Sequence, residues 1–196
     1  MIKIGLTGSI GMGKTETAKM FYKSGVPVFD SDGAVHMLLG ENGAAVDSVE
    51  AAFAGVKSDN KIDRKRLGAK VFGNANELEK LEKILHPMVS EMRSDFVKTA
   101  NSDLVLFDIP LLFEKSYENE CDFIVVVSAP LDVQRKRVMS RPGMTAQRFQ
   151  DILDSQMPDA EKREKADFII QTDKGFEYAR EQVQKIINNI RNDANA

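Results

Sequence analysis

The chain has 196 residues, of which 42% are hydrophobic and 29% charged, and 27 Lys and Arg against 30 Asp and Glu give a net charge of -3. These proportions predict an ordinary folded protein with one main domain, and they exclude a disordered chain, a collagen-like repeat and a disulfide scaffold. The chain has a single cysteine, Cys121, so neither an intramolecular disulfide nor a thiolate metal cluster can form.

The first residues, MIKIGLTG, contain too short an apolar stretch for a signal peptide, and no run approaches the roughly 18 apolar residues of a membrane span. Together with the single cysteine, this favours a cytoplasmic protein. The acidic balance gives no electrostatic footprint for wrapping duplex nucleic acid. We therefore expect neither a membrane nor nucleic acid as a partner.

Short apolar runs alternate with longer amphipathic runs, which is typical of a parallel sheet with helices on both faces. The clearest helix has an apolar stripe with a period of 3.6 residues near the C-terminus, over Phe176–Arg191. The sequence predicts a three-layer α/β/α fold on a five-stranded parallel sheet. The predicted strands are Ile2–Thr7, Val26–Asp30, Leu104–Asp108, Asp122–Ser128 and Phe168–Thr172.

Two excursions interrupt this pattern. Residues 31–103 carry no strand signal and are far more than a crossover needs. Their content predicts helices over Asp63–Phe72 and Asn74–Thr99, the second opened by Asn74 and Glu77 in capping-box spacing. The second excursion, residues 131–166, contains Arg141-Pro142-Gly143, a turn that must interrupt any helix.

The strongest motif follows the first predicted strand and precedes a helix. Gly8-Ser9-Ile10-Gly11-Met12-Gly13-Lys14-Thr15 is a complete G-x-x-x-x-G-K-[ST], in which glycines let backbone N–H groups curl around a phosphate. Lys14 can reach the β- and γ-phosphates, and the Thr15 hydroxyl can ligate Mg²⁺. A chance glycine-rich turn is the alternative, and the strand-helix context argues against it.

Two short matches point to a guanine-nucleotide switch. Asp30-Ser31-Asp32-Gly33 reads as D-x-x-G, and Asn60-Lys61-Ile62-Asp63 reads as N-K-x-D. Position argues against both, because Asp30 follows Lys14 by only one helix and one strand, and Asn60 follows no hydrophobic strand.

Carboxylates end two of the predicted strands, at the sheet edge where open α/β folds bind ligands. Asp30 and Asp32 end the second strand, where a kinase can use one carboxylate to orient or deprotonate the acceptor hydroxyl. Asp108 ends the third strand in the form of a Walker B carboxylate. Asp30 and Asp108 are the two candidate metal carboxylates. The alternative for all three is that an acidic residue caps the next helix.

Residues 133–150 contain five basic residues and no acid. Arg137 and Arg141 lie four apart and would share a helix face, as an arginine clamp over a transferring phosphate requires. A solvated basic face is the alternative. His86 precedes Pro87 in a helical run, where a helix-end histidine is the simpler interpretation, and we expect Cys121 in the core.

In this combination the chain resembles the dephospho-coenzyme A kinase family nearly end to end. Ser9 and Met12 stand where that family usually has Gly and Ser, Asp30-Ser31-Asp32 replaces the commoner Asp-Ala-Asp, and Thr172 falls where Asn is frequent. The matching segments are GLTGSIGMGKT, GVPVFDSD, Asp63-Arg64 with Leu67 and Val71-Phe72, Leu85-His86-Pro87, Pro110-Leu111-Leu112-Phe113-Glu114, Gln134 with Arg137 and Arg141, Gln156, and Ala166-Asp167.

The resemblance implies a P-loop nucleotide-kinase-like core over residues 1–32 and 101–196, a helical substrate-binding insertion over 33–100 and a lid over 138–162. It also implies the reaction, in which ATP phosphorylates the ribose 3′-hydroxyl of dephospho-CoA in the last step of coenzyme A synthesis. By position, Asp32 matches the family's base and Arg137 and Arg141 its phosphate-side arginines. The implied ATP site comprises Gly8, Gly11, Met12, Gly13, Lys14, Thr15, Glu16 and Arg137, and the implied acceptor site Asp32, Arg64, His86, Pro110 and Leu111, with Mg²⁺ on Thr15 and on Asp30 or Asp108.

Two other functions stay open at this point. Another small-molecule P-loop kinase, for a nucleoside or nucleotide, would fit the same loop and insertion. An ATP-sensing binding module would keep the loop but would need no base at Asp32. Turnover with ATP and dephospho-CoA separates the three.

Overall fold

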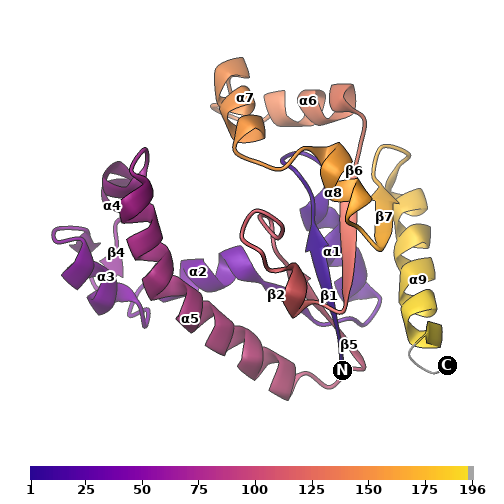
Figure 1. Ribbon diagram of the computed structural model, residues 1–196, viewed down its shortest axis with the longest axis horizontal. Coiled ribbons are helices and arrows are strands. Elements are labelled where there is room, and N and C mark those ends of the chain that lie inside the picture. The colour runs from indigo at the N-terminus through magenta and orange to yellow at the C-terminus, as the bar shows by residue number, and fades with distance from the viewer. Residues whose placement is uncertain (194–196) are drawn as a thin grey trace. The chain divides into compact units, whose positions relative to one another are not determined.

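The computed structural model describes residues 1–193 (Figure 1). The chain forms two compact units. The phosphate-loop unit consists of Met1–Phe29 and the chain from Ala100 onward, and the helical unit consists of Asp30–Thr99.

A five-stranded sheet organises the fold, in the order β2-β5-β1-β6-β7. In β1, Leu6 pairs in parallel register with Asp108 of β5 and Val125 of β6, so β1 lies between these two strands. Strands β2 and β5 lie on one side of β1, and β6 and β7 lie on the other, so the strand order switches direction at β1. Ligands bind in open parallel sheets at such a switch in strand order. The predicted fold class is thereby confirmed. The strands are β1 (Ile2–Thr7), β2 (Val28–Asp30), β5 (Leu104–Asp108), β6 (Phe123–Ser128) and β7 (Phe168–Gln171).

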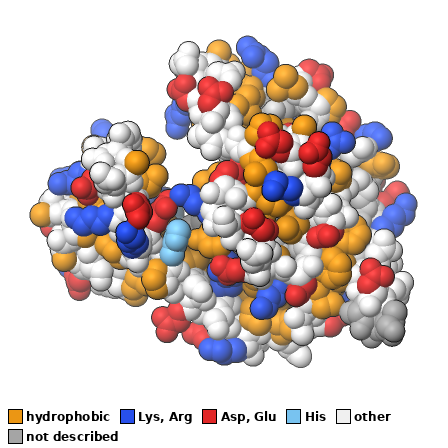
Figure 2. All heavy atoms as spheres, in the orientation of Figure 1, with side chains coloured by type: hydrophobic (Ala, Val, Ile, Leu, Met, Phe, Trp, Pro, Cys, Tyr) orange, Lys and Arg blue, Asp and Glu red, His pale blue; other side chains and the backbone are white. Residues whose placement is uncertain are grey.

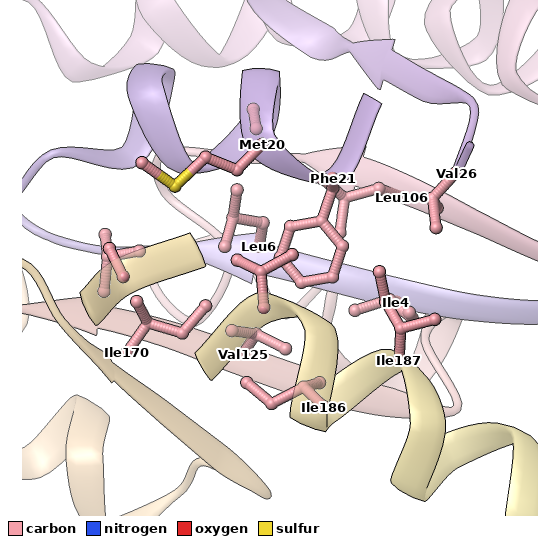
Figure 3. Packing of buried hydrophobic residues seen from close by; sticks show 14 of the residues in the cluster. Ile4, Leu6, Met20, Phe21, Val26, Leu106, Val125, Ile170, Ile186 and Ile187 are labelled. Carbon is pink, nitrogen blue, oxygen red and sulfur yellow. The ribbon is translucent and has the colours of Figure 1, made fainter. Parts of the chain in front are cut away.

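Helices α1 (Lys14–Lys23) and α9 (Phe176–Asp193) pack together on one face of the sheet. Ile4 and Leu6 alternate toward this face and meet Phe21 and Ile187, all of them fully buried (Figure 3). The predicted stripe of α9 is buried from Ala179 to Ile190, whereas its first residue, Phe176, is exposed.

Between Ile4 and Leu6, Gly5 points to the opposite face of the sheet. A Cβ atom at Gly5 would lie 2.7 Å from both Cys121 Sγ and Leu112 Cδ1, so only glycine fits there. Helix α8 (Asp159–Glu164) packs against β6. Cys121, which the sequence predicted in the core, is half-buried in this packing.

The second excursion contains α6 (Leu131–Met139), α7 (Ala146–Asp154) and α8. Helix α6 ends before Arg141, which precedes Pro142, and a proline disfavours helical backbone at the residue before it. The prediction that Arg137 and Arg141 share a helix face is therefore wrong. A short 3₁₀ helix, Glu118–Glu120, precedes β6.

The helical unit has a core of its own, built around Val49, Phe53 and Leu85. Asn74 accepts a hydrogen bond from Glu77 N at 3.3 Å, as the capping-box spacing predicted. Helix α5 continues through Pro87, so His86 lies within the helix and not at its end. The elements are α2 (Ser31–Leu39), α3 (Val46–Ala52), a hairpin of β3 (Lys57–Ser58) and β4 (Lys61–Ile62) that the sequence did not predict, α4 (Arg64–Val71) and α5 (Ala75–Thr99).

On the face drawn in Figure 2, acidic and basic side chains are interspersed and neither sign dominates. Within residues 1–193, no helix has both the length and the apolar character to cross a membrane.

Candidate active site

The loop Gly8–Thr15 connects β1 to α1, as the motif predicted. Its backbone needs glycine at three points, and at the first of them, Gly8, a Cβ atom would lie 2.4 Å from Val127 Cγ2. Gly11 and Gly13 have φ values of 77° and 98°, in the left-handed region that other residues rarely adopt. A Cβ atom at Gly11 would also lie 2.5 Å from Val138 Cγ2 of α6. The glycine pattern thus permits both the turn and the close approach of α6.

Lys14 forms an ion pair with Asp108 at the end of β5. The register places Asp108 beside Leu6, two residues before the first glycine of the loop, which brings the two charges together. The Lys14 and Asp108 side chains are only 17% and 10% exposed. The structure therefore brings the loop lysine and the Walker B-like carboxylate into one partly dry site, where a charge pair interacts more strongly than at the surface.

Arg137 lies against the phosphate loop. Its guanidinium donates to Thr172 Oγ1 at 2.9 Å and Thr172 O at 2.6 Å, and Nη1 lies 3.4 Å from Gly11 O. The Thr172 hydroxyl in turn donates to Met12 O at 2.7 Å. Thr172 is thus part of the loop's support, a role that the sequence did not predict.

Arg141 differs from Arg137. Its side chain is exposed and forms no hydrogen bond or ion pair within residues 1–193. Arg137 and Arg141 therefore share no hydrogen-bond partner in the part of the chain that the structure describes.

The remaining predicted residues of this unit lie near the ends of β1 and β5. Pro110 O accepts a hydrogen bond from Thr7 Oγ1 at 3.0 Å, which ties the segment after β5 to the start of the phosphate loop. Leu111 is half-buried in that segment. Glu16 is exposed on α1 and pairs with Lys19 at 2.7 Å.

The helical unit contains a groove of about 490 Å³ at the start of α2, lined by Asp30, Asp32, Gly33, Val35, His36 and Arg64. Asp30 caps α2, because its Oδ1 accepts from Gly33 N at 3.0 Å. A Cβ atom at Gly33 would lie 2.8 Å from Asp30 Oδ2, so this glycine leaves room for the cap. Asp32 is exposed in the first turn and is not the cap.

Arg64 begins α4 and reaches across the groove to α2. Its Nη1 lies 2.9 Å from His36 Nδ1, and because a guanidinium can only donate, the Nδ1 atom of His36 must accept. Asp63 caps α4 by accepting from Lys65 N and Arg66 N, and these bonds, the one from Arg66 first, hold its pKa below the usual range.

Two sequence matches are not part of this groove. His86 is exposed on α5 and does not line it. The N-K-x-D match lies in the β3–β4 hairpin, where Asp63 is occupied as a helix cap, so its carboxylate is not presented to a guanine base.

The sequence and fold match known proteins over nearly the whole chain. The family model for dephospho-CoA kinase matches residues 2–177. A dephospho-CoA kinase from Mesorhizobium japonicum is 51% identical over 194 residues, covering 97% of this chain and 98% of that protein. The chain belongs to the dephospho-CoA kinase family. The family's reaction is the ATP-dependent phosphorylation of dephospho-CoA, the final step of coenzyme A biosynthesis.

Solved structures agree with this assignment. The protein TT1252 from Thermus thermophilus matches with a TM-score of 0.86 and 30% identity, and a dephospho-CoA kinase from Campylobacter jejuni with 0.63 and 28%. Both comparisons cover 96% of this chain and 96% of the other.

This dephospho-CoA kinase family member departs from the usual motif at two loop positions, both of which are buried. Met12, in place of the usual Ser, accepts from Ala129 N through its sulfur at 3.1 Å. Ser9, in place of Gly, is 5% exposed, and the bond from Met12 N to its carbonyl, at 3.1 Å, is one that the backbone of a glycine would also make. Both replacements sit within the loop's own packing, so the loop accommodates them.

Proposed function

We propose that the protein transfers the γ-phosphoryl group of ATP to the ribose 3′-hydroxyl of dephospho-CoA, giving coenzyme A and ADP. The observation that carries the residue assignment is the Lys14–Asp108 pair at the end of the phosphate loop. It gathers a cation for the phosphates and a carboxylate for a metal at one sheet edge. Family membership supports the choice of acceptor.

The ATP phosphates bind in the loop. The N–H groups at Gly11, Gly13 and the first turn of α1 surround them, and the positive end of α1 favours their charge. Lys14 leaves Asp108 for the β- and γ-phosphates, which are stronger anionic partners, and stabilises the charge that moves onto the bridging oxygen. Met12 and Glu16 complete the ATP-binding segment, and the Thr172 hydroxyl holds its Met12 carbonyl.

The donors for Mg²⁺ fit this site. Mg²⁺ takes oxygen ligands, usually one or two from the protein together with waters and substrate phosphates. The Thr15 hydroxyl in the first turn of α1 and the Asp108 carboxylate are such donors. We prefer Asp108 to Asp30, because Asp30 is occupied as a helix cap. When bound, the ion neutralises charge on the phosphates.

Asp32 acts on the acceptor. Its carboxylate takes the proton of the ribose 3′-hydroxyl as the oxygen attacks the γ-phosphorus. The bond from phosphorus to the bridging oxygen breaks, and ADP leaves with that electron pair. Arg64, oriented by His36 in the same groove, is suited to an anionic group of dephospho-CoA.

The roles of the larger segments are part of the same proposal. The insertion, residues 33–100, binds dephospho-CoA with contributions from His86, and Pro110 and Leu111 contact the acceptor from the segment after β5. Residues 138–162 act as a lid, with Arg137 and Arg141 on the phosphates. A cytoplasmic location, supported by the single cysteine, completes the proposal.

Product analysis tests this function. The protein is incubated with Mg²⁺, ATP and dephospho-CoA, and phosphorus NMR follows the products. We expect one new 3′-phosphomonoester for each ADP formed. ADP without a phosphorylated acceptor, or a phosphate at another position, would contradict the proposal. A nucleoside acceptor that turns over faster than dephospho-CoA would favour the other kinase class.

A further inference from the structure

Both backbone polar groups of Ile10, in the phosphate loop, are bonded to glutamine side chains. Gln134 of α6 donates from Nε2 to Ile10 O at 2.8 Å. Ile10 N donates to Oε1 of Gln156, in the segment between α7 and α8, at 3.0 Å. The two amides are used in opposite senses, Gln134 as a donor and Gln156 as an acceptor.

These bonds fix the orientations of two consecutive peptide groups, Ser9–Ile10 through its N–H and Ile10–Gly11 through its carbonyl. A backbone N–H donates in one direction, so the Ile10 N–H is directed to Gln156 and not to a phosphate. Gly11 follows at once, with a left-handed φ of 77° and α6 packed against it. Holding Ile10 therefore also sets the direction in which the amides of Gly11, Gly13 and the first turn of α1 are presented, whereas the Met12 N–H donates to Ser9 O. Donors that are already oriented need no rearrangement when phosphate charge develops.

Both glutamines are themselves held in place. Gln134 is 2% exposed on the buried side of α6. Next to Gln156, Met157 N donates to Glu114 Oε1 at 2.8 Å, and the same oxygen lies 2.8 Å from Nζ of the fully buried Lys162. Ser128 Oγ donates to Asp159 Oδ2 at 2.7 Å at the start of α8. The support of Gln156 thus runs into the core of the phosphate-loop unit.

We propose that Gln134 and Gln156 are positioning residues of the kinase, which hold the backbone of Ile10 so that the loop presents the amides of Gly11, Gly13 and the first turn of α1 to ATP. They act through the loop and do not touch the nucleotide. The inference rests on the proposed ATP site in this loop. It gives the second excursion, residues 131–166, a role in ATP binding, through two glutamines that are held by the core of the phosphate-loop unit.

Replacing one glutamine at a time by glutamate tests the proposal, because glutamate keeps the hydrogen-bond acceptor of glutamine but loses its donor. Gln156→Glu preserves the bond from Ile10 N, whereas Gln134→Glu sets a carboxylate against the Ile10 carbonyl. Both variants add one negative charge beside Ile10, and the charge costs more at Gln134, which is 2% exposed, than at the half-buried Gln156. The Met variants at both positions keep the approximate shape and remove the bond without adding charge.

The measurements are kcat/KM for ATP, KM for dephospho-CoA, and Tm. We expect Gln156→Met and Gln134→Met to lower kcat/KM for ATP about 10-fold, with KM for dephospho-CoA within about 2-fold of the parent protein. Gln156→Glu should retain kcat/KM for ATP within about 3-fold, and Gln134→Glu should lose at least as much as Gln134→Met. If burial of the charge unfolds Gln134→Glu, the Met variants and Gln156→Glu still decide.

Two results would overturn the inference. One is a fall in Tm of both Met variants with no change in kcat/KM for ATP, which would mean a purely structural role. The other is equal losses in Gln156→Glu and Gln156→Met. Lys14→Ala, measured in parallel, separates this failure from that of the ATP site, because an unimpaired Lys14→Ala protein would refute the loop assignment itself.

Discussion

The two units hold their functional side chains in different ways. In the phosphate-loop unit the groups of the ATP site are bonded to one another, as in the Lys14–Asp108 pair and the contacts of Arg137 with Thr172. In the helical unit Asp32 and Arg64 are exposed in an open groove, and the hydrogen bond from Arg64 to His36 holds one of these two side chains. Substitutions at the ATP site should therefore affect stability as well as catalysis, whereas those in the groove should affect catalysis or acceptor binding alone.

The largest effect is expected at Lys14. We expect Lys14→Ala to lower kcat about 10³-fold, because the loop lysine stabilises charge on the transferring phosphoryl group. Steady-state turnover measures this, and Lys19→Ala, an exposed lysine on the same helix, is the control. A near-normal rate in Lys14→Ala would remove the loop from the mechanism. Because Lys14 also neutralises Asp108, a fall in Tm should accompany the loss.

Arg137 and Arg141 differ in the same way within one segment, because Arg137 is bonded to the loop and Arg141 is exposed. We expect Arg137→Ala and Arg141→Ala each to lower kcat about 10-fold or more, and by more than they raise KM for dephospho-CoA. Only Arg137→Ala should also lower Tm, by about a few degrees, because it removes the partly buried hydrogen bonds to Thr172. Arg135→Ala, on the exposed side of α6, is the control. Unchanged kcat in both variants would leave Arg137 as a structural support of the loop and Arg141 as part of a solvated basic face.

Arg64 tests the open groove. Arg64→Ala should raise KM for dephospho-CoA about 10-fold while KM for ATP stays within about 2-fold, since it removes one charged contact to the acceptor. Arg66→Ala, which removes an exposed guanidinium from the same helix, should change neither constant. If KM for ATP rises instead, Arg64 serves the other substrate.

The smallest effect concerns an ion pair outside both sites. Arg191 donates to both carboxylate oxygens of Asp103, at 2.7 and 2.9 Å, and these bonds lower the pKa of Asp103. A lowered pKa adds stability above the unfolded value of about 3.9, and this stability is lost as the pH falls through the folded pKa. Asp103→Asn should cost about 0.5 kcal/mol of unfolding free energy at pH 7, because the pair is exposed. The difference should vanish in acid, and kcat should be unchanged.

The sheet could be predicted because its strands are continuous apolar runs buried on both faces. Ile2–Thr7 and Leu104–Asp108 agree with the structure at both ends. Val26 and Pro27 were included in β2 but precede it, and Pro27 has no N–H to donate to a ladder. The β3–β4 hairpin was missed because each strand has only two residues. Its signal is Asp59-Asn60, which both adopt positive φ as a tight hairpin turn requires.

The site was predictable where a motif fixes backbone geometry, as at Gly11, Gly13 and Lys14. The supports of the loop were not, because Gln134 and Gln156 meet Ile10 across 124 and 146 positions of sequence. The signal that the sequence does carry is that Gln134 and Gln156 are both among the residues that match the family. The cap role of Asp30 was foreseen as an alternative, but the sequence could not say which of the two aspartates takes it.

Asp30 and Asp32 therefore give the most direct test of the proposed mechanism, in which Asp32 is the base and Asp30 is the helix cap. The measurement is kcat with saturating ATP and dephospho-CoA for Asp32→Asn and Asp30→Asn. Asp32→Asn should lose about 10²-fold or more, with KM for ATP within a few-fold. Asp30→Asn should lose less than about 5-fold, because asparagine caps a helix as well as aspartate does. A large loss at Asp30 with little at Asp32, or little loss at either, would contradict the account.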